Sequence, residues 1–314
     1  MKTAITDKTL AYARYNPSHV PDQALKAYSE SVLGCGADYI EVNVGTAGRL
    51  ADTDFSENYI LELQQPSDLA FCEEHRFAYV VLPFFLVGMI DRIPEDQPVI
   101  LEKSADEYSA HAVIMFLHRF TFIRRISAIR LTGIFGESTA DLVKWCRTKL
   151  YMPIDLCPLN TTMSGTMSAI DAADAGASMI TLSFGKGYYY TALEEYLIGY
   201  NTTRRIMLDN KVIKAVCTAS FLYTEIFGVI PAGLARMIDA ETNITAPVYD
   251  AESGMLFKPY RVLGGIRRAE KDDTVTRKIK SLGLELELEN AVIEAIKKVD
   301  LNLYNVIKKG HEIE

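Results

Sequence analysis

The chain has 314 residues, of which 49% are hydrophobic and 24% are charged, and its formal net charge is −8 at pH 7. This length and composition suit one barrel domain of roughly 250 residues with a smaller appendage. The negative charge is spread along the sequence. It argues against a nucleic-acid partner and against binding to an anionic membrane, because either would need a basic patch.

The cysteines and the apolar runs indicate the compartment. The five cysteines are scattered without Cys-x-x-Cys spacing, which is typical of reduced thiols in the cytosol. The N-terminus, MKTAITDKTL, lacks the apolar core of a signal peptide. The most hydrophobic run, residues 78–90, contains Pro83 and is too short to span a bilayer. We therefore expect a cytoplasmic protein.

Short apolar runs alternate with helical patterns over most of the chain. Eight runs have the length and composition of buried strands: 3–6, 39–44, 59–63, 78–83, 98–102, 127–131, 154–157 and 179–183. Helical periodicity marks seven segments: 18–33, 66–75, 106–122, 138–150, 164–175, 191–200 and 202–228. This alternation predicts a parallel (β/α)8 barrel, with short or irregular units between the second and fifth strands.

The composition changes after Pro247. Residues 261–265 are strand-like, and residues 277–282 and 289–309 have the pattern of charged amphipathic helices. We therefore divide the chain into a barrel domain, residues 1–240, and a C-terminal subdomain, residues 241–314. The predicted fold class is α/β, a (β/α)8 TIM barrel with a small α+β lid.

One segment, residues 153–199, carries a resemblance to a known family. Residues 175–177 (Ala-Gly-Ala), Gly185 and residues 192–195 (Ala-Leu-Glu-Glu) fall at the spacings of that family's signature. The segment resembles the homocitrate synthase and 2-isopropylmalate synthase family, the HMG-CoA-lyase-like (HMGL-like, DRE-TIM) metal-dependent barrels. Residues 7–10 (Asp-Lys-Thr-Leu) and 40–42 (Ile-Glu-Val) are similar to the ends of the family's first two strands. The resemblance covers strands 1–2 and 6–8 and the lid.

The resemblance implies an activity whose residues are replaced here. Family members are dimers that use a divalent cation to polarise a 2-oxo acid during attack by the carbanion of acetyl-CoA. Their metal ligands are an Asp, the two histidines of His-x-His, and an Asn. The corresponding positions here hold Tyr12, Cys157, Leu159 and Thr191, and Ala11 replaces the arginine that binds the 2-oxo acid. We therefore expect the family's scaffold with no metal ligands and no cofactor.

Other polar residues are expected at the barrel mouth and are candidates for catalysis. Lys103 and Lys186 follow strands, as does Lys8. A lysine desolvated beside apolar neighbours can form a Schiff base with a carbonyl substrate, although a solvated loop lysine is the commoner case. Glu41 and Glu102 would act as general bases, or would form salt bridges inside the barrel mouth.

A further set of residues is expected to contact a substrate: Asp7, Asn43, Cys157, Asn160, Ser183 and Tyr188. Cys157 is either a nucleophilic thiol or a small hydrophobic residue of the core. Asn160 matches the family motif and would equally cap the following helix. The three tyrosines at 188–190 either stack a planar ligand or fill the vacated pocket.

These residues support two classes of function. The first is a non-catalytic relative of the acyl-CoA-condensing synthases. It would be a homodimer, a regulatory subunit in a heterodimer with a catalytic paralogue, or a binder of a small carboxylate. The second is an enzyme with metal-independent, lyase- or aldolase-like chemistry on a carboxylate or carbonyl substrate. A third hypothesis keeps the acyltransferase activity, a Claisen condensation, and needs metal ligands that the sequence does not supply. Fold arguments alone do not separate them.

Overall fold

Eight parallel strands close into a barrel in chain order, and β8 pairs with β1. The computed structural model describes residues 2–12, 20–50, 53–106, 108–120, 123, 125–136, 138–160, 164–185, 190–204, 209–227, 248–250 and 255–257. The barrel strands are β1 (Ala4–Asp7), β2 (Tyr39–Val42), β3 (Tyr59–Glu62), β4 (Tyr79–Pro83), β5 (Val99–Ser104), β6 (Ile126–Gly133), β7 (Ile154–Pro158) and β8 (Met179–Leu182). The predicted (β/α)8 barrel is confirmed.

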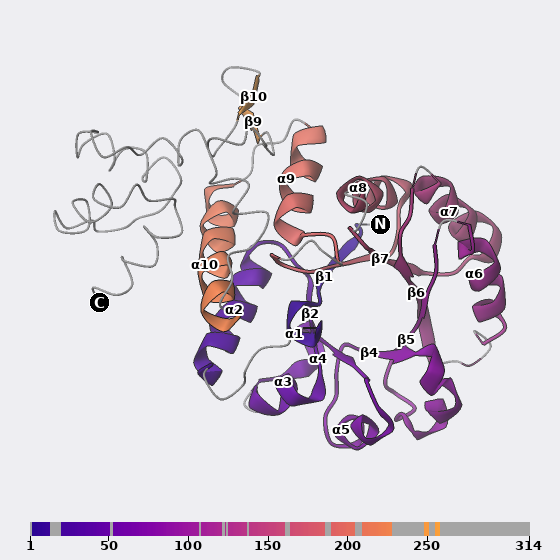
Figure 1. Cartoon of the computed structure of the whole chain (residues 1–314). Coiled ribbons are helices and arrows are strands. Elements are labelled where there is room, and N and C mark those ends of the chain that lie inside the picture. Colours follow the sequence, from indigo (N-terminus) through magenta and orange to yellow (C-terminus); the bar gives the residue numbers. More distant parts are fainter. Residues whose placement is uncertain are drawn as a thin grey trace, which may run out of the picture.

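The helices surround the ring of strands (Figure 1). They are α1 (Thr9–Tyr12), α2 (Asp22–Gly34), α3 (Val44–Arg49), α4 (Phe55–Asn58), η2 (Pro66–Asp68), α5 (Leu69–Glu74), η3 (Phe84–Arg92), α6 (Ala110–His118), α7 (Thr139–Trp145), η4 (Cys146–Leu150), α8 (Gly165–Ala175), α9 (Leu193–Thr203) and α10 (Asn210–Phe227). α10 packs against α2, so the outer layer is closed between the last strand and the first.

Each of the eight predicted barrel strands is confirmed to within two residues at either end. The helices between β2 and β5 are short, as predicted, since α3 and α5 have 6 residues each. Several helix boundaries differ from the prediction, and the helix expected over 106–122 is limited to α6, Ala110–His118. α2 begins at Asp22, directly after Pro21, rather than at residue 18. A single helix over 202–228 was wrong, because α9 continues to Thr203 and α10 starts anew where the Asp209 carboxylate accepts a hydrogen bond from the Lys211 N–H.

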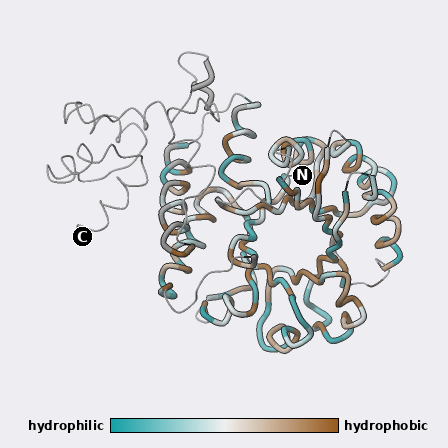
Figure 2. Tube along the Cα trace, in the orientation of Figure 1, coloured by the Kyte–Doolittle hydropathy of each residue, from teal (hydrophilic) through white to brown (hydrophobic). Residues whose placement is uncertain are grey.

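The inside of the barrel changes character along its axis. Toward the N-terminal ends of the strands it is filled by apolar side chains: Ile60, Val81, Ile100, Ala128 and Met179. Further along, the buried inward-facing side chains are charged or polar, and they include Glu41, Arg130 and Asp155. In Figure 2, hydrophobic residues predominate along the ring of strands and hydrophilic ones are frequent on the surrounding helices. The barrel therefore encloses a polar layer above an apolar one.

Little of the predicted lid falls within the described residues. An antiparallel hairpin pairs β9 (Val248–Asp250) with β10 (Met255–Phe257). The strand predicted at 261–265 and the helices predicted at 277–282 and 289–309 lie outside the described part, and the division at residue 240 stays a prediction. No helix in the described part is both long and apolar enough to cross a bilayer.

Candidate functional site

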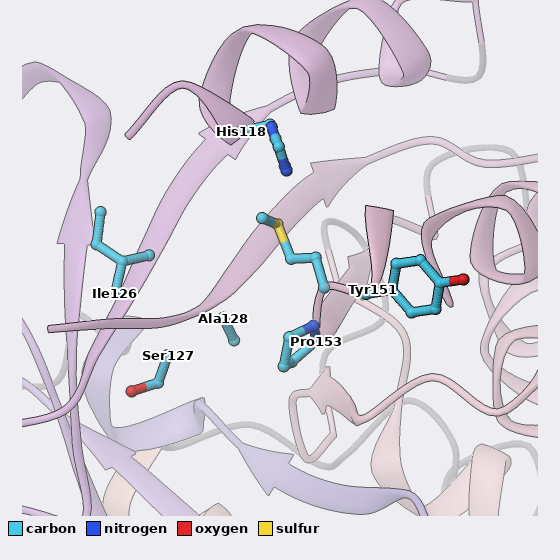
Figure 3. Close-up of a pocket in the computed structure, with 7 residues that line it drawn as sticks. His118, Ile126, Ser127, Ala128, Tyr151 and Pro153 are labelled. Carbon is cyan, nitrogen blue, oxygen red and sulfur yellow. The ribbon is translucent and has the colours of Figure 1, made fainter. Parts of the chain in front are cut away.

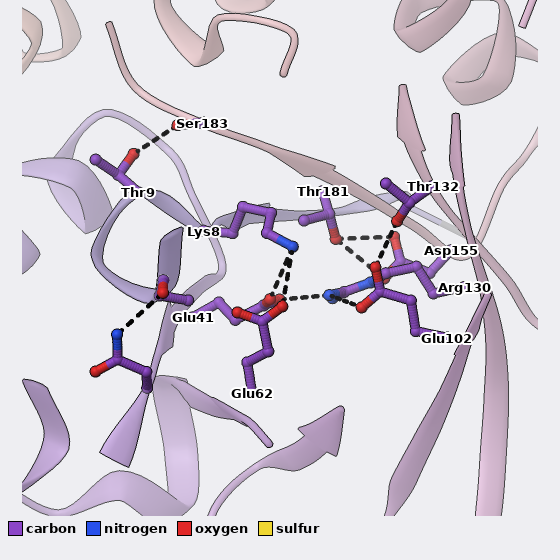
Figure 4. Close-up of polar contacts among 12 residues, drawn as sticks. Lys8, Thr9, Glu41, Glu62, Glu102, Arg130, Thr132, Asp155, Thr181 and Ser183 are labelled. Carbon is purple, nitrogen blue, oxygen red and sulfur yellow. Dashed lines mark hydrogen bonds and ion pairs between the residues drawn. The ribbon is translucent and has the colours of Figure 1, made fainter. Parts of the chain in front are cut away.

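Two buried cations organise the barrel interior. Arg130 lies in the middle of β6, and its Nη1 is 2.7 Å from Glu41 Oε2, in an ion pair without hydrogen-bond alignment. The Arg130 Nε donates to the Asp155 carboxylate. Lys8 follows β1, and its Nζ is 3.5 Å from both Glu41 and Glu62. Figure 4 shows both cations directed toward the same group of carboxylates.

The barrel register brings these residues together. Alternate residues of a strand face the same side, and Glu102, Arg130 and Asp155 occupy facing positions on β5, β6 and β7. Arg130 Nη1 is 3.7 Å from Glu102 Oε2. Two hydroxyls add hydrogen bonds to these carboxylates. Thr132 donates to Glu102 at 2.6 Å, and Thr181 donates to Asp155 at 3.0 Å. Neighbouring strands thus supply opposite charges at the same height.

Lys8 is held in its charged form. Burial opposes the ammonium form of Lys8, but the Glu62, Glu102 and Glu41 carboxylates outweigh that effect and raise its pKa well above the ordinary value. A buried charge is tolerated only when it is paired, and Lys8 is 1% exposed. A lysine with a raised pKa is a poor nucleophile, because the attacking form is the neutral amine.

Two carboxyls at the edge of this cluster have pKa values shifted in opposite directions. Burial raises the pKa of Glu62, and the nearby Lys8 offsets only part of that effect. At Glu102 the effect of burial is outweighed by Lys8, Arg130 and the Thr132 hydrogen bond, so its pKa is lowered. Of this pair, Glu62 is the group that takes up a proton more readily. Such a division is typical of an acid and a base in one site.

An open pocket of about 380 Å³ gives solvent access to this cluster. It lies at the C-terminal ends of β3, β4 and β5 and is lined by Glu62, Pro83, Phe84, Phe85, Glu102, Lys103 and Ser104. The side chains of Glu62 and Glu102 are 16% and 14% exposed. Lys103 Nζ lies 4.8 Å from the centre of the Phe84 ring. Chemistry in TIM barrels occurs at this end of the strands, so we place the candidate site here.

A second pocket, of about 250 Å³, lies at the opposite end of the barrel. Its lining comes from the starts of β6 and β7 and the residues before them: His118, Ile126, Ser127, Ala128, Tyr151, Met152 and Pro153 (Figure 3). The N-terminal face of a TIM barrel usually contributes to stability rather than to chemistry. The pocket contains no member of the charged cluster, and we assign it no function.

The candidates for catalysis occupy different environments. Glu41 is completely buried between Lys8 and Arg130. Lys103 is half-buried and lines the open pocket. Lys186 lies outside the described residues, and so does Tyr188, a candidate for substrate binding. Of the two described candidates, Glu41 and Lys103, it is Lys103 that a ligand in the pocket would meet.

Asp7 and Ser183 lie beside the loop that follows β8. The Asp7 carboxylate accepts hydrogen bonds from the hydroxyls of Thr9 and Tyr28 and from the backbone N–H of Phe184. Burial raises the pKa of Asp7 to about 6, although these hydrogen bonds oppose the shift. The Ser183 and Thr9 hydroxyls are 3.2 Å apart. Both candidates thus take part in contacts that hold the chain between β1 and β8.

A buried carboxyl that the sequence interpretation missed lies near Asp7. Glu194, in the first turn of α9, is fully buried, and its Oε2 accepts a hydrogen bond from the Gly185 N–H at 3.1 Å. Burial raises the pKa of Glu194 to about 8. Gly185 has φ of 84°, and a Cβ there would lie 2.8 Å from the Tyr223 ring. The loop therefore begins on a glycine held between α9 and α10.

The remaining candidates have structural contacts. Asn43 caps α3, since its side-chain oxygen accepts from the Thr46 N–H while its amide donates to the Ala11 carbonyl. Asn160 accepts from the Gly165 N–H at the start of α8, which is the capping role that the sequence allowed. Cys157 is fully buried, and burial raises its pKa to about 12. Its thiol is therefore protonated at neutral pH.

At three of the positions that the resemblance assigns to metal ligands, the side chains offer a divalent cation no ready ligand. Cys157 is a protonated thiol, Leu159 has no donor atom in its side chain, and the Thr191 hydroxyl donates to a backbone carbonyl. The carboxylates of the barrel interior are paired with Lys8 and Arg130. Across the described ranges, no three His, Cys, Asp or Glu side chains are grouped so as to hold a metal ion.

Sequence reasoning missed three members of the charged cluster: Glu62, Arg130 and Asp155. Each was treated as part of a predicted strand. A usable signal was present, because a charged residue within a short apolar strand of a barrel must either point outward or find a buried partner. Identifying the partner required the register of the strands.

The comparisons with known proteins support the fold. No family model and no curated protein matches the chain. An HMG-CoA lyase from Acinetobacter baumannii, solved with coenzyme A and 3-methylmalate, has a TM-score of 0.55 at 14% identity, covering 77% of this chain and 96% of that one. An HMG-CoA lyase from Pseudomonas aeruginosa has a TM-score of 0.52 at 13% identity, covering 73% and 94%.

An N-terminal domain of a putative aldolase from Bacteroides vulgatus is also similar, with a TM-score of 0.50 at 15% identity and coverage of 73% of this chain and 93% of that one. At identities this low, similarity in structure shows the fold and leaves the chemistry open. The chain has the barrel fold of the HMG-CoA lyases and related aldolases.

Proposed function

We propose that this chain is a non-catalytic relative of the HMG-CoA-lyase-like barrels that binds a small molecule at the barrel mouth. The observation that carries the proposal is the pairing of Lys8 and Arg130 with the carboxylates inside the barrel. Side-chain cations balance most of the charge there. A protein that neutralises these carboxylates with its own residues does not need a metal to do so.

The state of the nucleophiles supports the same proposal. Lys8 is buried with a raised pKa, and the Cys157 thiol has a pKa raised to about 12 by burial. Nucleophilic catalysis needs the neutral amine or the thiolate, and both are scarce at neutral pH under these conditions. Binding a ligand needs only a shaped pocket with a few polar groups, and the open pocket at β4 and β5 has that form.

The assembly that we propose follows from the family resemblance. The chain would form a homodimer, or a heterodimer in which a catalytic paralogue supplies the activity and this chain supplies a regulatory site. We place it in the cytoplasm because of its scattered cysteines. Co-purification with a catalytic paralogue is the expected result for the heterodimer, and a stable homodimer without such a partner would exclude that form.

One observation favours a second candidate, an enzyme with metal-independent chemistry on a carbonyl or carboxylate substrate. The pKa of Glu62 is raised while that of Glu102 is lowered, and both line the open pocket with Lys103. This arrangement would serve proton transfer, with Glu62 as the acid. Lys103 would form the Schiff base. Borohydride reduction with a carbonyl substrate would then leave an adduct on Lys103 that mass spectrometry detects.

Activity and binding assays on the full chain test the proposal. The protein is incubated with Mg²⁺ or Mn²⁺, acetyl-CoA and a series of 2-oxo acids, and separately with HMG-CoA, and free coenzyme A and new acyl products are measured. We expect no turnover. Metal-dependent formation of a condensation or cleavage product would overturn the proposal. A borohydride adduct that disappears in Lys103→Gln would replace it with the second candidate.

A further inference from the structure

The charges that meet at the barrel mouth do not balance. Four carboxylates belong to the cluster: Glu41, Glu62, Glu102 and Asp155. Three cations accompany them within the described residues, Lys8 and Arg130 inside the barrel and Lys103 on the wall of the pocket. Counted as ionised, these described groups sum to one net negative charge. A single positive charge on a bound molecule would neutralise the site.

The excess negative charge lies on the side of the pocket. Arg130 contacts Glu41 at 2.7 Å and bonds directly to Asp155, so those two carboxylates are well compensated. The two carboxylates that line the pocket have longer contacts, 3.5 Å from Glu62 to Lys8 and 3.7 Å from Glu102 to Arg130. The Glu102 Oε2 atom is buried and accepts no hydrogen bond within the described part of the chain. The cation nearest to it is the Arg130 guanidinium, at 3.7 Å.

Part of the pocket lining is apolar. Pro83, Phe84 and Phe85 contribute it, and Phe85 is 73% exposed. Lys103 already covers one face of the Phe84 ring, so a second cation would be repelled from that side. A ligand is thus expected to place its charge near Glu62 and Glu102 and an apolar substituent against Phe85.

A carboxylate ligand fits this distribution poorly. Its negative charge would meet Glu62 and Glu102, with Lys103 as its one cation among the residues that line the pocket. Repulsion between a ligand and like charges in a partly buried site lowers affinity as effectively as missing contacts do. The charge of the pocket therefore favours an organic cation over the small carboxylate that the sequence predicts.

We propose that the pocket binds a small primary ammonium ion with an apolar substituent, its ammonium group between Glu62 and Glu102 and its substituent against Phe85. This inference rests on the proposed function, because it names the class of ligand for the same binding site. An ammonium group offers three donors to the two carboxylates, and the substituent replaces water on the exposed aromatic ring.

Calorimetric titration of the full chain with butylammonium chloride tests the proposal. Sodium butanoate and sodium chloride at equal ionic strength are the matched comparisons. We expect saturable binding of butylammonium and none of butanoate. Glu62→Gln should weaken binding by about tenfold or more, because a hydrogen bond to a charged group is lost. Glu57→Gln, at an exposed position of α4 before the start of β3, should bind as the unchanged protein does.

Folding is controlled within the same experiment. Glu62 is partly exposed and Lys8 keeps Glu41 as a partner, so Glu62→Gln is expected to stay folded, which the thermal unfolding midpoint checks. Phe85→Ala supplies a second variant that should fold, since the residue is mostly exposed. It should weaken the binding of butylammonium more than the binding of methylammonium. Unchanged affinity in Glu62→Gln, or butanoate binding as tightly as butylammonium, would overturn the proposal.

Different results would refute the ligand class and the proposed function. Absence of butylammonium binding, together with absence of acyl-CoA turnover, refutes the ligand class and leaves the non-catalytic function in place. Metal-dependent turnover of an acyl-CoA substrate refutes the proposed function, whether or not butylammonium binds. Binding of butylammonium that is lost in Glu62→Gln, with no turnover, supports both.

Discussion

Two groups of buried carboxyls in this barrel have different partners. Inside the barrel, Glu41 and Asp155 lie against Arg130 in direct ion pairs. Near the start of the loop after β8, Asp7 and Glu194 are equally buried, but they accept hydrogen bonds from hydroxyls and backbone N–H groups. Within the described residues, the first group is paired with cations and the second with neutral donors.

The difference shows what a buried carboxyl needs in order to stay ionised. Hydrogen bonds oppose the effect of burial at Asp7 and Glu194, yet burial still raises their pKa values to about 6 and about 8. At Glu102, Lys8 and Arg130 reverse the effect of burial and lower the pKa. Neutral donors thus moderate desolvation. Cations overcome it at Glu102, but at Asp155 burial still raises the pKa although Arg130 opposes the shift. The pKa of Glu102 is therefore lowered, whereas those of Asp7 and Glu194 are raised.

Removal of the central cation should have the largest effect. Arg130→Met leaves Glu41 and Asp155 buried without their partner, and loss of one member of a buried ion cluster costs about 3–5 kcal/mol of unfolding free energy. Urea unfolding at pH 7 measures the change. Arg76→Met, which breaks an exposed pair with Asp96, is the matched control and should cost less than about 1 kcal/mol. Equal effects of the two substitutions would contradict the role that we assign to Arg130.

Glu194 should lower the stability of the fold as pH rises, whereas a carboxylate in a salt bridge raises it. The folded-state pKa of Glu194 is about 8, above its unfolded value of 4.5, so the folded protein binds this proton more tightly. Its contribution therefore reduces stability as pH rises from 4.5 to 8. Glu194→Gln imitates the protonated form and keeps an oxygen for the Gly185 N–H. We expect the variant to match the parent near pH 4.5 and to exceed it at pH 8 by a margin on the order of a few kcal/mol.

Urea unfolding at half-unit steps of pH provides the measurement for Glu194. Glu57→Gln, on the surface of α4, is the control and should leave the pH profile of the parent unchanged. Should Glu194→Gln and the parent show parallel profiles from pH 4.5 to pH 8, Glu194 is ionised throughout that range in the folded state. The contrast between the two groups of carboxyls would then have to be abandoned.

The turn that meets Glu194 should be sensitive to a single methyl group. Gly185→Ala places a Cβ 2.8 Å from the Tyr223 ring at a φ of 84°, where side chains are disfavoured. We expect a loss of about 2 kcal/mol of unfolding free energy from the combined strain and overpacking. Gly48→Ala, where a Cβ would meet no atom within 4 Å, is the control. If the thermal unfolding midpoint falls equally in both variants, the contact between Gly185 and Tyr223 of α10 is not tight.

The sequence predicts the local features of this site and misses the long-range ones. The strands are found because each is a short apolar run between turn signals, and Asn160 is identified as a cap because its partner, Gly165, is five residues away. Arg130 is missed because its partners, Glu41 and Asp155, come from strands that only the closed barrel brings beside β6. Lys8 is interpreted as a solvated or reactive lysine for the same reason.

The smallest expected effect concerns the thiol of Cys157, which occupies a position that the resemblance assigns to a metal ligand. Cys157 is fully buried beside the charged cluster, and burial raises its pKa to about 12 even though Lys8 and Arg130 oppose the shift. The proximity of two cations is thus insufficient to generate a thiolate where water is excluded. Iodoacetamide at pH 7 should leave Cys157 unmodified in the folded protein and should modify it fully in urea, as read by peptide mass spectrometry. Rapid alkylation of the folded chain at this residue would mean that the mouth of the barrel opens to solvent, and Cys157 would then replace Lys103 as the residue to test for covalent chemistry.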